Sequence, residues 1–265
     1  MPLLHIVVLA LIQGLTEFLP VSSSAHLILG SRVFGWPDQG LVFDVATHLG
    51  TLLAVLFYFR RELAAMLAAV LRPVTDEAGR ANRALVGWLA IASVPALAAG
   101  ALAHDLVEFY LRDVRVIAVT TLLFGGVLWW ADRVGATSRE VRDVDWRAAV
   151  VIGLAQALAL VPGVSRSGVT ITAGRYLGFG PEAAARFSFL LAIPIIAAAG
   201  AYGALKVAAH QAPIDWSGFG LAVGFAALAG WVCIAAFLAL LRRVGLVPFV
   251  IYRLCLGAVL LWLVI

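Results

Sequence analysis

The sequence has few charged residues and almost no cysteine. Only 13% of its 265 residues are charged, whereas 63% are hydrophobic and the mean hydropathy is +1.01. Soluble domains carry about 25% charged and about 45–50% apolar residues. This composition therefore excludes a soluble enzyme and a disordered chain, and it predicts an integral membrane protein lying in a lipid bilayer.

The sequence contains two cysteines and one lysine. Cys233 and Cys255 are the only cysteines, and both lie in apolar stretches, so neither a disulfide framework nor a cysteine metal site is indicated. Lysine occurs once, and the 18 arginines are scattered between apolar blocks instead of forming one basic face. We therefore expect no nucleic-acid partner, although the formal net charge is +4.

Six apolar blocks are long enough to cross a bilayer, because a hydrocarbon core about 30 Å thick needs roughly 20 helical residues. They are residues 41–59, 84–103, 116–131, 187–205, 218–241 and 247–265. The segment 62–71 has helical spacing but is too short to span, so we expect it at the cytoplasmic interface.

Two other apolar regions are interrupted by Pro, Gly and Ser. The first covers residues 2–34 and breaks at 20–24, and the second covers 146–177 and breaks at 162–167. Proline and glycine stop a helix, and the resumed pieces are too short to span. Each region therefore predicts a hairpin that enters the membrane and turns back.

The two broken regions resemble each other at one constant offset along the chain. The matching pairs are Gln13 and Gln156, Leu15 and Leu158, Val21 and Val164, Ser22 and Ser165, Ser24 and Ser167, Ile28 and Ile171, Arg32 and Arg175, and Gly35 and Gly178. Each copy is a hairpin followed by three spans, and because three is odd, the second copy must be inverted relative to the first.

The predicted fold class is an all-α polytopic membrane protein with an inverted-topology repeat. Each repeat is a broken re-entrant helical hairpin plus three transmembrane helices, and the two hairpins meet near the midplane. We expect a single membrane domain over 1–265, with repeat one at 1–133 and repeat two at 146–265. Twelve arginines fall in the loops of one side, which is therefore cytoplasmic. The first hairpin, both chain ends and a loop at 103–115 then face outward.

An ionisable side chain inside a membrane is costly and marks a candidate functional site. The candidates are Glu17, His26, Arg32, Asp44, His48, Arg166 and Arg175. Gln13 and Glu17 are four residues apart, so on a helix they share a face and can address one ligand or metal ion together. Alternatively, Glu17 caps its helix or pairs with an arginine of the other hairpin.

Both breaks have the composition of a phosphate site. In the first, Ser22, Ser23 and Ser24 lie between Glu17 and His26, which favours a nucleophile or phosphate ligand over hydroxyls that only satisfy the backbone. In the second, Arg166 offers a planar fork to phosphate oxygens, and the neighbouring glycines and hydroxyls supply further donors. These neighbours are Gly163, Ser165, Ser167, Gly168 and Thr170.

The remaining polar residues allow two interpretations. Asp44, His48 and Thr51 follow helical spacing and either line the cavity or satisfy one another. Arg32 and Arg175 occupy equivalent repeat positions, where they could be structural anchors that pair with carboxylates or carbonyls.

Residues 13–26, QGLTEFLPVSSSAH, resemble the [E/Q]-x-x-x-E plus P-V-S-S motif of the undecaprenyl-diphosphate phosphatase family, also known as bacitracin-resistance proteins. Residues 162–170, PGVSRSGVT, resemble the second signature of that family, P-G-x-S-R-S-G-x-T. The likeness covers nearly the whole chain. Two departures are Gln13, where many members have Glu, and Ala25, where a Gly-His pair is common.

The resemblance implies hydrolysis of undecaprenyl diphosphate to undecaprenyl phosphate and inorganic phosphate at the outer face of the bacterial plasma membrane. It implies a divalent cation, Mg²⁺ or Ca²⁺, held by Glu17 with Gln13. Glu17, His26 and Arg166 are the expected catalytic residues, with Ser23 as the nucleophile if a serine attacks instead of water. The expected phosphate ligands are Ser22, Ser24, Gly163, Ser165, Ser167, Gly168 and Thr170.

A competing function is a transporter or flippase for a lipid phosphate or another anion, because inverted repeats with broken helices are typical of transporters. The sequence leaves open whether two copies form a homodimer.

Overall fold

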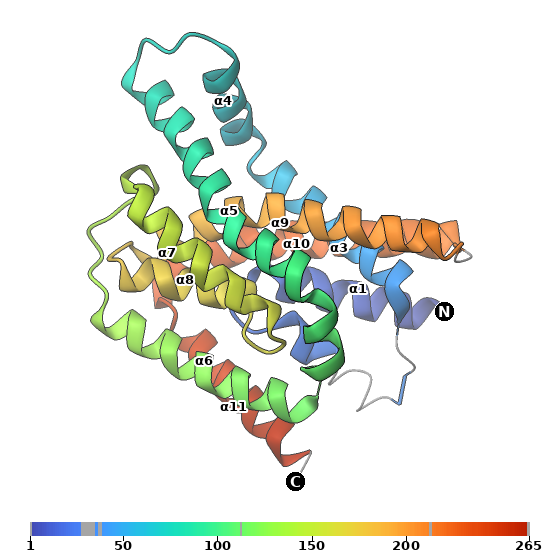
Figure 1. Ribbon diagram of the computed structural model, residues 1–265. Coiled ribbons are helices and arrows are strands. Elements are labelled where there is room, and N and C mark those ends of the chain that lie inside the picture. Colours follow the sequence, from blue (N-terminus) through green and yellow to red (C-terminus); the bar gives the residue numbers. More distant parts are fainter. Residues whose placement is uncertain (1, 28–34, 37–38, 112, 212–213, 264–265) are drawn as a thin grey trace.

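The computed structural model describes residues 2–27, 35–36, 39–111, 113–211 and 214–263, with the side chains of 104–110 outside the description. The chain folds into packed helices (Figure 1). In chain order they are α1 (Leu3–Phe18), α3 (Gly40–Tyr58), α4 (Arg60–Leu71), α5 (Glu77–Tyr110), α6 (Val114–Val134), η1 (Val141–Asp143), α7 (Trp146–Ala157), η2 (Leu158–Leu160), α8 (Arg166–Tyr176), α9 (Pro181–Ala209), α10 (Trp216–Val244) and α11 (Val247–Trp262).

Five of the described helices are long and apolar enough to cross a membrane: α3, the 77–103 part of α5, α6, α9 and α10. The chain is therefore a multi-pass membrane protein of the all-α class, as predicted. The sixth predicted span, 247–265, forms α11, which has 16 residues and is shorter than a full span.

Several helices extend beyond the apolar blocks that predicted them. Helix α5 covers Glu77–Tyr110 instead of 84–103, so most of the loop expected at 103–115 is helical. Helix α9 covers Pro181–Ala209 instead of 187–205. Hydropathy marks the part of a helix that lies in the hydrocarbon, whereas backbone hydrogen bonding continues into polar surroundings until a cap or a break ends it.

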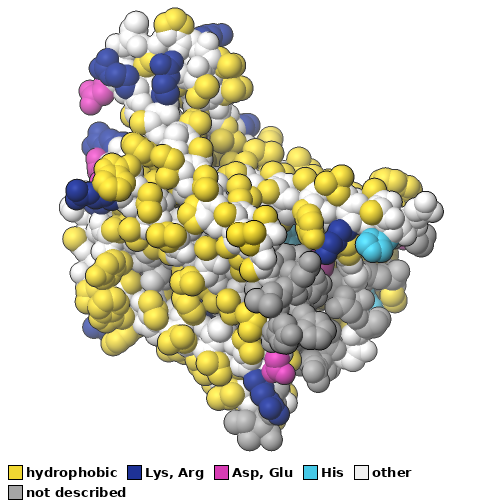
Figure 2. Space-filling model, viewed as in Figure 1, with side chains coloured by type: hydrophobic (Ala, Val, Ile, Leu, Met, Phe, Trp, Pro, Cys, Tyr) yellow, Lys and Arg dark blue, Asp and Glu magenta, His cyan; other side chains and the backbone are white. Residues whose placement is uncertain are grey.

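Helix α4 matches the short helix predicted at 62–71, and together with the beginning of α5 it projects from the bundle (Figure 1). Basic side chains gather on this projection (Figure 2). Arg83 donates to the carbonyl oxygens of Ala69 and Arg72, at 2.7 and 2.6 Å, and Glu62 pairs with Arg186 at 2.6 Å. The Arg83 bonds join the two helices of the projection to each other, and the Glu62–Arg186 pair joins it to α9 of the bundle. Its location at the cytoplasmic interface stays a prediction.

The first arm of each hairpin packs on a long helix from the other half of the chain, α1 on α10 and α7 on α5. Glycines permit the close approach. A Cβ on Gly14 would lie 2.7 Å from the Ala226 carbonyl oxygen, and one on Gly153 would lie 2.6 Å from that of Ala92. Small residues of this kind let membrane helices approach backbone to backbone. The two halves are therefore interlocked.

The local backbone repeats at the offset seen in the sequence. Ser22 and Ser165 have φ values of 71° and 70°, and Gly35 and Gly178 have φ values of 62° and 87°. The two members of each pair occupy equivalent positions in the two broken regions. The inverted orientation of the two copies and their boundaries stay predictions.

Candidate active site

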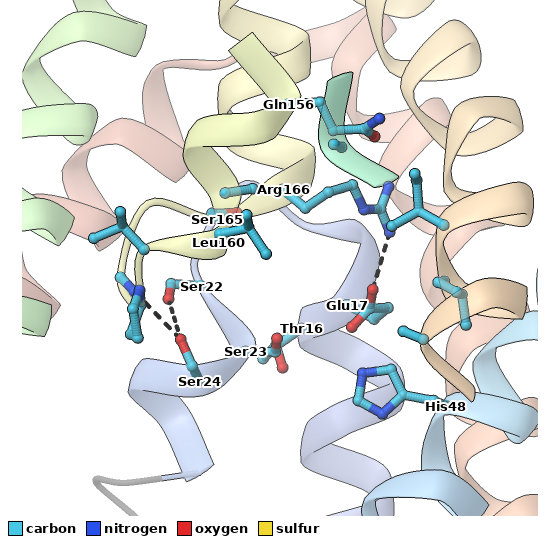
Figure 3. Close-up of a pocket in the computed structure, with 18 residues that line it drawn as sticks. Thr16, Glu17, Ser22, Ser23, Ser24, His48, Gln156, Leu160, Ser165 and Arg166 are labelled. Carbon is cyan, nitrogen blue, oxygen red and sulfur yellow. Dashed lines mark hydrogen bonds and ion pairs between the residues drawn. The ribbon is translucent and has the colours of Figure 1, made fainter. Parts of the chain in front are cut away.

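A cavity of about 300 Å³ lies between the two hairpin turns. Its polar wall includes Glu17, His48, Gln156 and Arg166 together with the serines of both turns, and its apolar wall includes Leu160 and Ile196 (Figure 3). Segments from the two halves of the chain therefore build one amphipathic pocket.

Both turns contain a serine in the left-handed backbone region. Ser22 and Ser165 have positive φ, a conformation that costs a residue with a side chain about 1–2 kcal/mol. The hydroxyl of Ser22 lies 3.1 Å from that of Ser24, and the hydroxyl of Ser165 lies 3.3 Å from that of Ser167. Such conformations persist only where surrounding contacts hold them, and they cluster at functional sites.

Direct contacts join the two hairpins beside the cavity. Arg166 Nη2 donates to Glu17 Oε1 at 3.0 Å, and the hydroxyl of Ser167 donates to the Leu19 carbonyl oxygen at 2.7 Å. The backbone N–H of Gly163 donates to Ser24 Oγ at 3.4 Å. The prediction that the hairpins meet at a shared site is confirmed.

Glu17 is engaged through both carboxylate oxygens. Arg166 binds one, and Gln13 Nε2 donates to the other at 2.7 Å. The Arg166 and Glu17 side chains are only 12% and 10% exposed, so this ion pair is largely removed from water. The remaining amide oxygen of Gln13 is buried and has no hydrogen-bond partner in the described part of the chain.

Arg166 begins helix α8, with Ser165 as its N-cap. The Ser165 hydroxyl accepts from the Gly168 N–H at 3.1 Å, and Arg166 Nη1 donates to the Ser188 carbonyl oxygen at 3.2 Å. One edge of the guanidinium is thus anchored to α9 while another reaches Glu17. Helix N-termini carry free N–H groups and a partial positive charge, both of which favour an anion.

Ser23 lies on the cavity wall with its hydroxyl uncommitted among the described residues. It is half-buried, it lines the cavity, and its hydroxyl makes no hydrogen bond to any described residue. Ser22 and Ser24 also line the cavity, but their hydroxyls contact each other.

His26 differs from the sequence-based expectation, whereas His48 follows one of the two interpretations given for it. His26 does not line the cavity: its Nδ1 contacts the Ser22 carbonyl oxygen at 2.8 Å and its Nε2 contacts the Tyr252 hydroxyl at 2.6 Å. The reason is that His26 lies in the helical segment 23–27, which follows the first turn, on the side that faces Tyr252 of α11. His48 lines the cavity instead, and its Nδ1 donates to the Asp44 carbonyl oxygen at 2.7 Å.

Ser167, Gly168 and Thr170 are not on the cavity wall, although the sequence assigned them to phosphate. Successive residues of a helix point about 100° apart, so only the residues at the start of α8 face the cavity. Ser167 joins the hairpins, and the hydroxyl of Thr170 contacts that of Ser188 at 2.7 Å within the protein. Gly168 packs against Arg253.

The other polar candidates serve the fold. Arg175 pairs with Asp132 at 2.8 Å and donates to loop carbonyls, so it is the structural anchor that one interpretation expected. The Thr51 hydroxyl donates to the His48 carbonyl oxygen at 3.0 Å, and neither Asp44 nor Thr51 lines the cavity. Arg32 lies outside the described residues.

Sequence reasoning missed two buried residues next to the turns. Gln156 lines the cavity, and its amide oxygen has no partner in the part of the chain that is described. Its equivalence to Gln13 in the repeat was the available signal. Arg253 is fully buried and binds backbone carbonyls of both turns. The sequence feature that could have identified Arg253 is the presence of an arginine inside an otherwise apolar segment.

Comparisons with known proteins match nearly the whole chain. Residues 6–259 match the family described as "Bacitracin resistance protein BacA". The chain is 51% identical to an undecaprenyl-diphosphatase of Teredinibacter turnerae, over 98% of each chain. It is 50% identical to undecaprenyl-diphosphatase 1 of Pseudoalteromonas translucida, over 97% of each chain. It is 49% identical to an undecaprenyl-diphosphatase of Saccharophagus degradans, again over 97% of each.

Proposed function

Because the chain belongs to the bacitracin resistance protein BacA family, we propose that it hydrolyses undecaprenyl diphosphate to undecaprenyl phosphate and inorganic phosphate. The observation that carries this proposal is the largely buried Arg166–Glu17 pair between two serine-rich turns at one cavity. The product is a lipid carrier that is returned to cell-wall synthesis.

The reaction adds one water across a phosphoanhydride bond. An oxygen nucleophile attacks the terminal phosphorus, the bond to the bridging oxygen breaks, and that oxygen stays with undecaprenyl phosphate. If Ser23 attacks, its hydroxyl proton is removed and water hydrolyses the phosphoserine in a second step. If water attacks, transfer is direct. In both routes the protein mainly positions the groups and neutralises charge.

Arg166 is the group that neutralises the transferred phosphoryl. Its planar fork fits two phosphate oxygens, and the N-terminus of α8 adds N–H donors beside it. Arrival of the diphosphate exchanges the Arg166–Glu17 contact for an Arg166–phosphate contact. A cavity of about 300 Å³ is at the small end of ligand pockets and suits the head group, so the polyprenyl chain lies outside it in the bilayer.

A divalent cation would be held by a Glu17 carboxylate oxygen, with the Gln13 amide oxygen as a second ligand if the cation displaces the Gln13–Glu17 hydrogen bond. Mg²⁺ and Ca²⁺ prefer carboxylate and amide oxygens, and the buried amide oxygen of Gln13 has no other described partner. One carboxylate and one amide oxygen leave most positions for water and substrate phosphate, as is usual for Mg²⁺. When bound, the ion would supply charge neutralisation to the diphosphate oxygens.

His48 is better placed than His26 to exchange a proton with the substrate. Its Nδ1 donates to a carbonyl, so in the neutral ring Nε2 is the acceptor. Figure 3 shows this ring on the cavity side, facing Glu17. His26 has both ring nitrogens engaged and supports the first turn through Ser22.

We place the site on the outer side of the bacterial plasma membrane. The arginine-rich loops are cytoplasmic by the positive-inside rule, which directs the first hairpin outward. Carrier released at the outer face would then be processed where it is released.

The test is phosphate release by purified protein in detergent, with farnesyl or undecaprenyl diphosphate and added Mg²⁺ or Ca²⁺. Hydrolysis requires no second compartment, so we expect turnover without a membrane gradient. A protein that moves labelled lipid phosphate across liposomes but releases no phosphate in detergent is a transporter, and that result would reject the proposal.

A further inference from the structure

Arg253 is a fully buried cation in α11 with no counter-ion in the described structure. None of its surface is exposed, and no described carboxylate lies within ion-pair distance of it. Arg175, the other deeply buried arginine of the hairpin region, is paired with Asp132. Removing an arginine from water without a carboxylate is costly unless its N–H groups are satisfied and an anion is close by.

The guanidinium binds carbonyl oxygens of both hairpin turns. Its Nη2 donates to Gly163 at 2.7 Å and to Val164 at 2.5 Å, and its Nη1 reaches Pro20 of the first turn at 3.4 Å. Its Nε donates to Thr121 of α6 at 3.0 Å. One side chain thus ties the first turn, the second turn and a spanning helix together.

These bonds fix the direction of the backbone next to the cavity. In a trans peptide the C=O and N–H point in opposite directions, and none of the described peptide bonds is cis. The Val164 carbonyl points at Arg253, so the Ser165 N–H of the same peptide unit points away from it. Ser165 lines the cavity and Arg253 does not. We infer that this N–H is the donor that the second turn offers to a ligand.

Gly163 and Val164, whose carbonyl oxygens Arg253 binds, directly precede Ser165, which has a positive φ. Ser165 has φ 70° and caps α8, and a strained conformation needs outside support to persist. Gly168 leaves room for that support, because a Cβ there would lie 2.5 Å from Arg253 Nη1.

We propose that Arg253 is a positioning residue of the phosphate site. It holds the two turns together and orients the Ser165 N–H away from its own guanidinium, and it supplies a second positive charge behind the turns. The proposal rests on the proposed function for its substrate, a lipid diphosphate. The predicted effect of Arg253 on binding applies to any phosphate anion in the cavity, whether or not it is hydrolysed.

The experiment compares Arg253→Gln and Arg253→Lys with Arg175→Gln, which also removes a buried arginine that binds carbonyls. Two quantities are measured for each folded protein: turnover of farnesyl diphosphate, and the affinity for methylene diphosphonate from the ligand-dependent rise in Tm. The second needs no catalysis, so it tests Arg253 even if the protein proves not to be a phosphatase.

We expect Arg253→Gln to weaken diphosphonate binding about tenfold or more and to lower kcat, the scale expected for one charge-assisted contact. Arg253→Lys should recover part of the affinity, since it keeps the charge, but little of kcat, since it cannot hold both turns. Arg175→Gln should lower Tm and leave diphosphonate affinity within about twofold of wild type.

Gly168→Ala keeps the proposal testable if Arg253→Gln does not fold. The added methyl lies closest to the guanidinium, at 2.5 Å, and more loosely against the Ser165 side chain, at 3.1 Å, whereas the control Gly174→Ala on the same helix meets Ala184. We expect weaker diphosphonate binding in the first and not in the second. Unchanged binding and turnover in folded Arg253→Gln or in Gly168→Ala would show that Arg253 only supports the fold.

Discussion

At the scale of single residues, the cavity wall holds a carboxylate and a guanidinium in direct contact. Glu17 binds Arg166 on one side and Gln13 on the other, so its charge is matched before any ligand arrives. This pairing lets a largely buried arginine and a largely buried carboxylate stabilise each other, and it keeps both in place for phosphate and cation.

Glu17→Gln should lower phosphate release about 100-fold or more without unfolding the protein. The amide keeps the shape but removes the charge that offsets Arg166 and holds a cation. Turnover is measured at saturating metal, with Tm as the control for folding. Wild-type turnover would assign Glu17 a structural role. Gln13→Glu should be tolerated and should lower the metal concentration needed for half-maximal activity.

Arg166→Lys should lose most activity although the charge is kept, roughly 100-fold in kcat/KM. A lysine cannot offer two parallel donors to phosphate while also reaching Ser188. Rate is measured against substrate concentration. Full recovery of the rate at high substrate would mean that Arg166 only attracts the ligand.

His48→Asn should lower kcat by about 100-fold and leave KM nearly unchanged, because Nε2 exchanges a proton with the substrate in the proposed reaction. The asparagine can still donate to the Asp44 carbonyl, so the helix is preserved. In contrast, His26→Asn should lower Tm through loss of its Tyr252 contact and reduce kcat less. Equal activity of His48→Asn and wild type would return the proton-transfer role to His26.

At the scale of elements, the second turn depends on the absence of a side chain at Gly163. This residue has φ 90°, and a Cβ would lie 2.6 Å from the Ile117 carbonyl oxygen of α6. Helix α6 also holds the turn through Thr120, whose hydroxyl donates to the Pro162 carbonyl oxygen at 2.7 Å. The turn is therefore shaped by its contact with a spanning helix.

Gly163→Ala should destabilise the protein by roughly 2–4 kcal/mol and nearly abolish turnover, since it adds both backbone strain and overpacking. Gly126→Ala is the matched control on α6, where a Cβ meets nothing within 4 Å. The control should stay within about 1 kcal/mol of wild type. Thermal unfolding in detergent gives both values, and equal Tm for the two variants would contradict the role of the turn.

At the scale of the whole molecule, the arginine distribution predicts which side each loop faces. Arg115 lies in the first turn of α6, Thr137 follows its C-terminal end, and both are exposed. If α6 spans the membrane, we expect the two residues on opposite sides. After replacement of Cys233 and Cys255 by alanine, Arg115→Cys should react with an impermeant thiol reagent in intact cells. Thr137→Cys should react only after the membrane is opened.

The reverse labelling pattern would invert the topology and move the cavity to the cytoplasm. Labelling of both positions from outside would mean that α6 does not span the membrane.

The fold class, five of the six predicted spans and the two breaks could be predicted from the order of the amino acids alone. These features follow from local quantities, because hydropathy over about 20 residues reports a span and proline with glycine reports a break. Both motifs and the constant offset between the two broken regions were predictable in the same way. The pairing of Glu17 with an arginine of the other hairpin was one of two alternatives, and the packing of the two hairpins decided it.

Which of the motif residues face the cavity depended on how the helices pack. A motif gives positions along the chain, whereas the direction of a side chain depends on where its helix begins and what it packs against. For this reason His48, and not His26, lines the cavity, and Ser167, Gly168 and Thr170 face the protein interior. It is also why Arg253 emerged as a contact of both turns, since residues 20, 163 and 253 meet only when the two halves interlock.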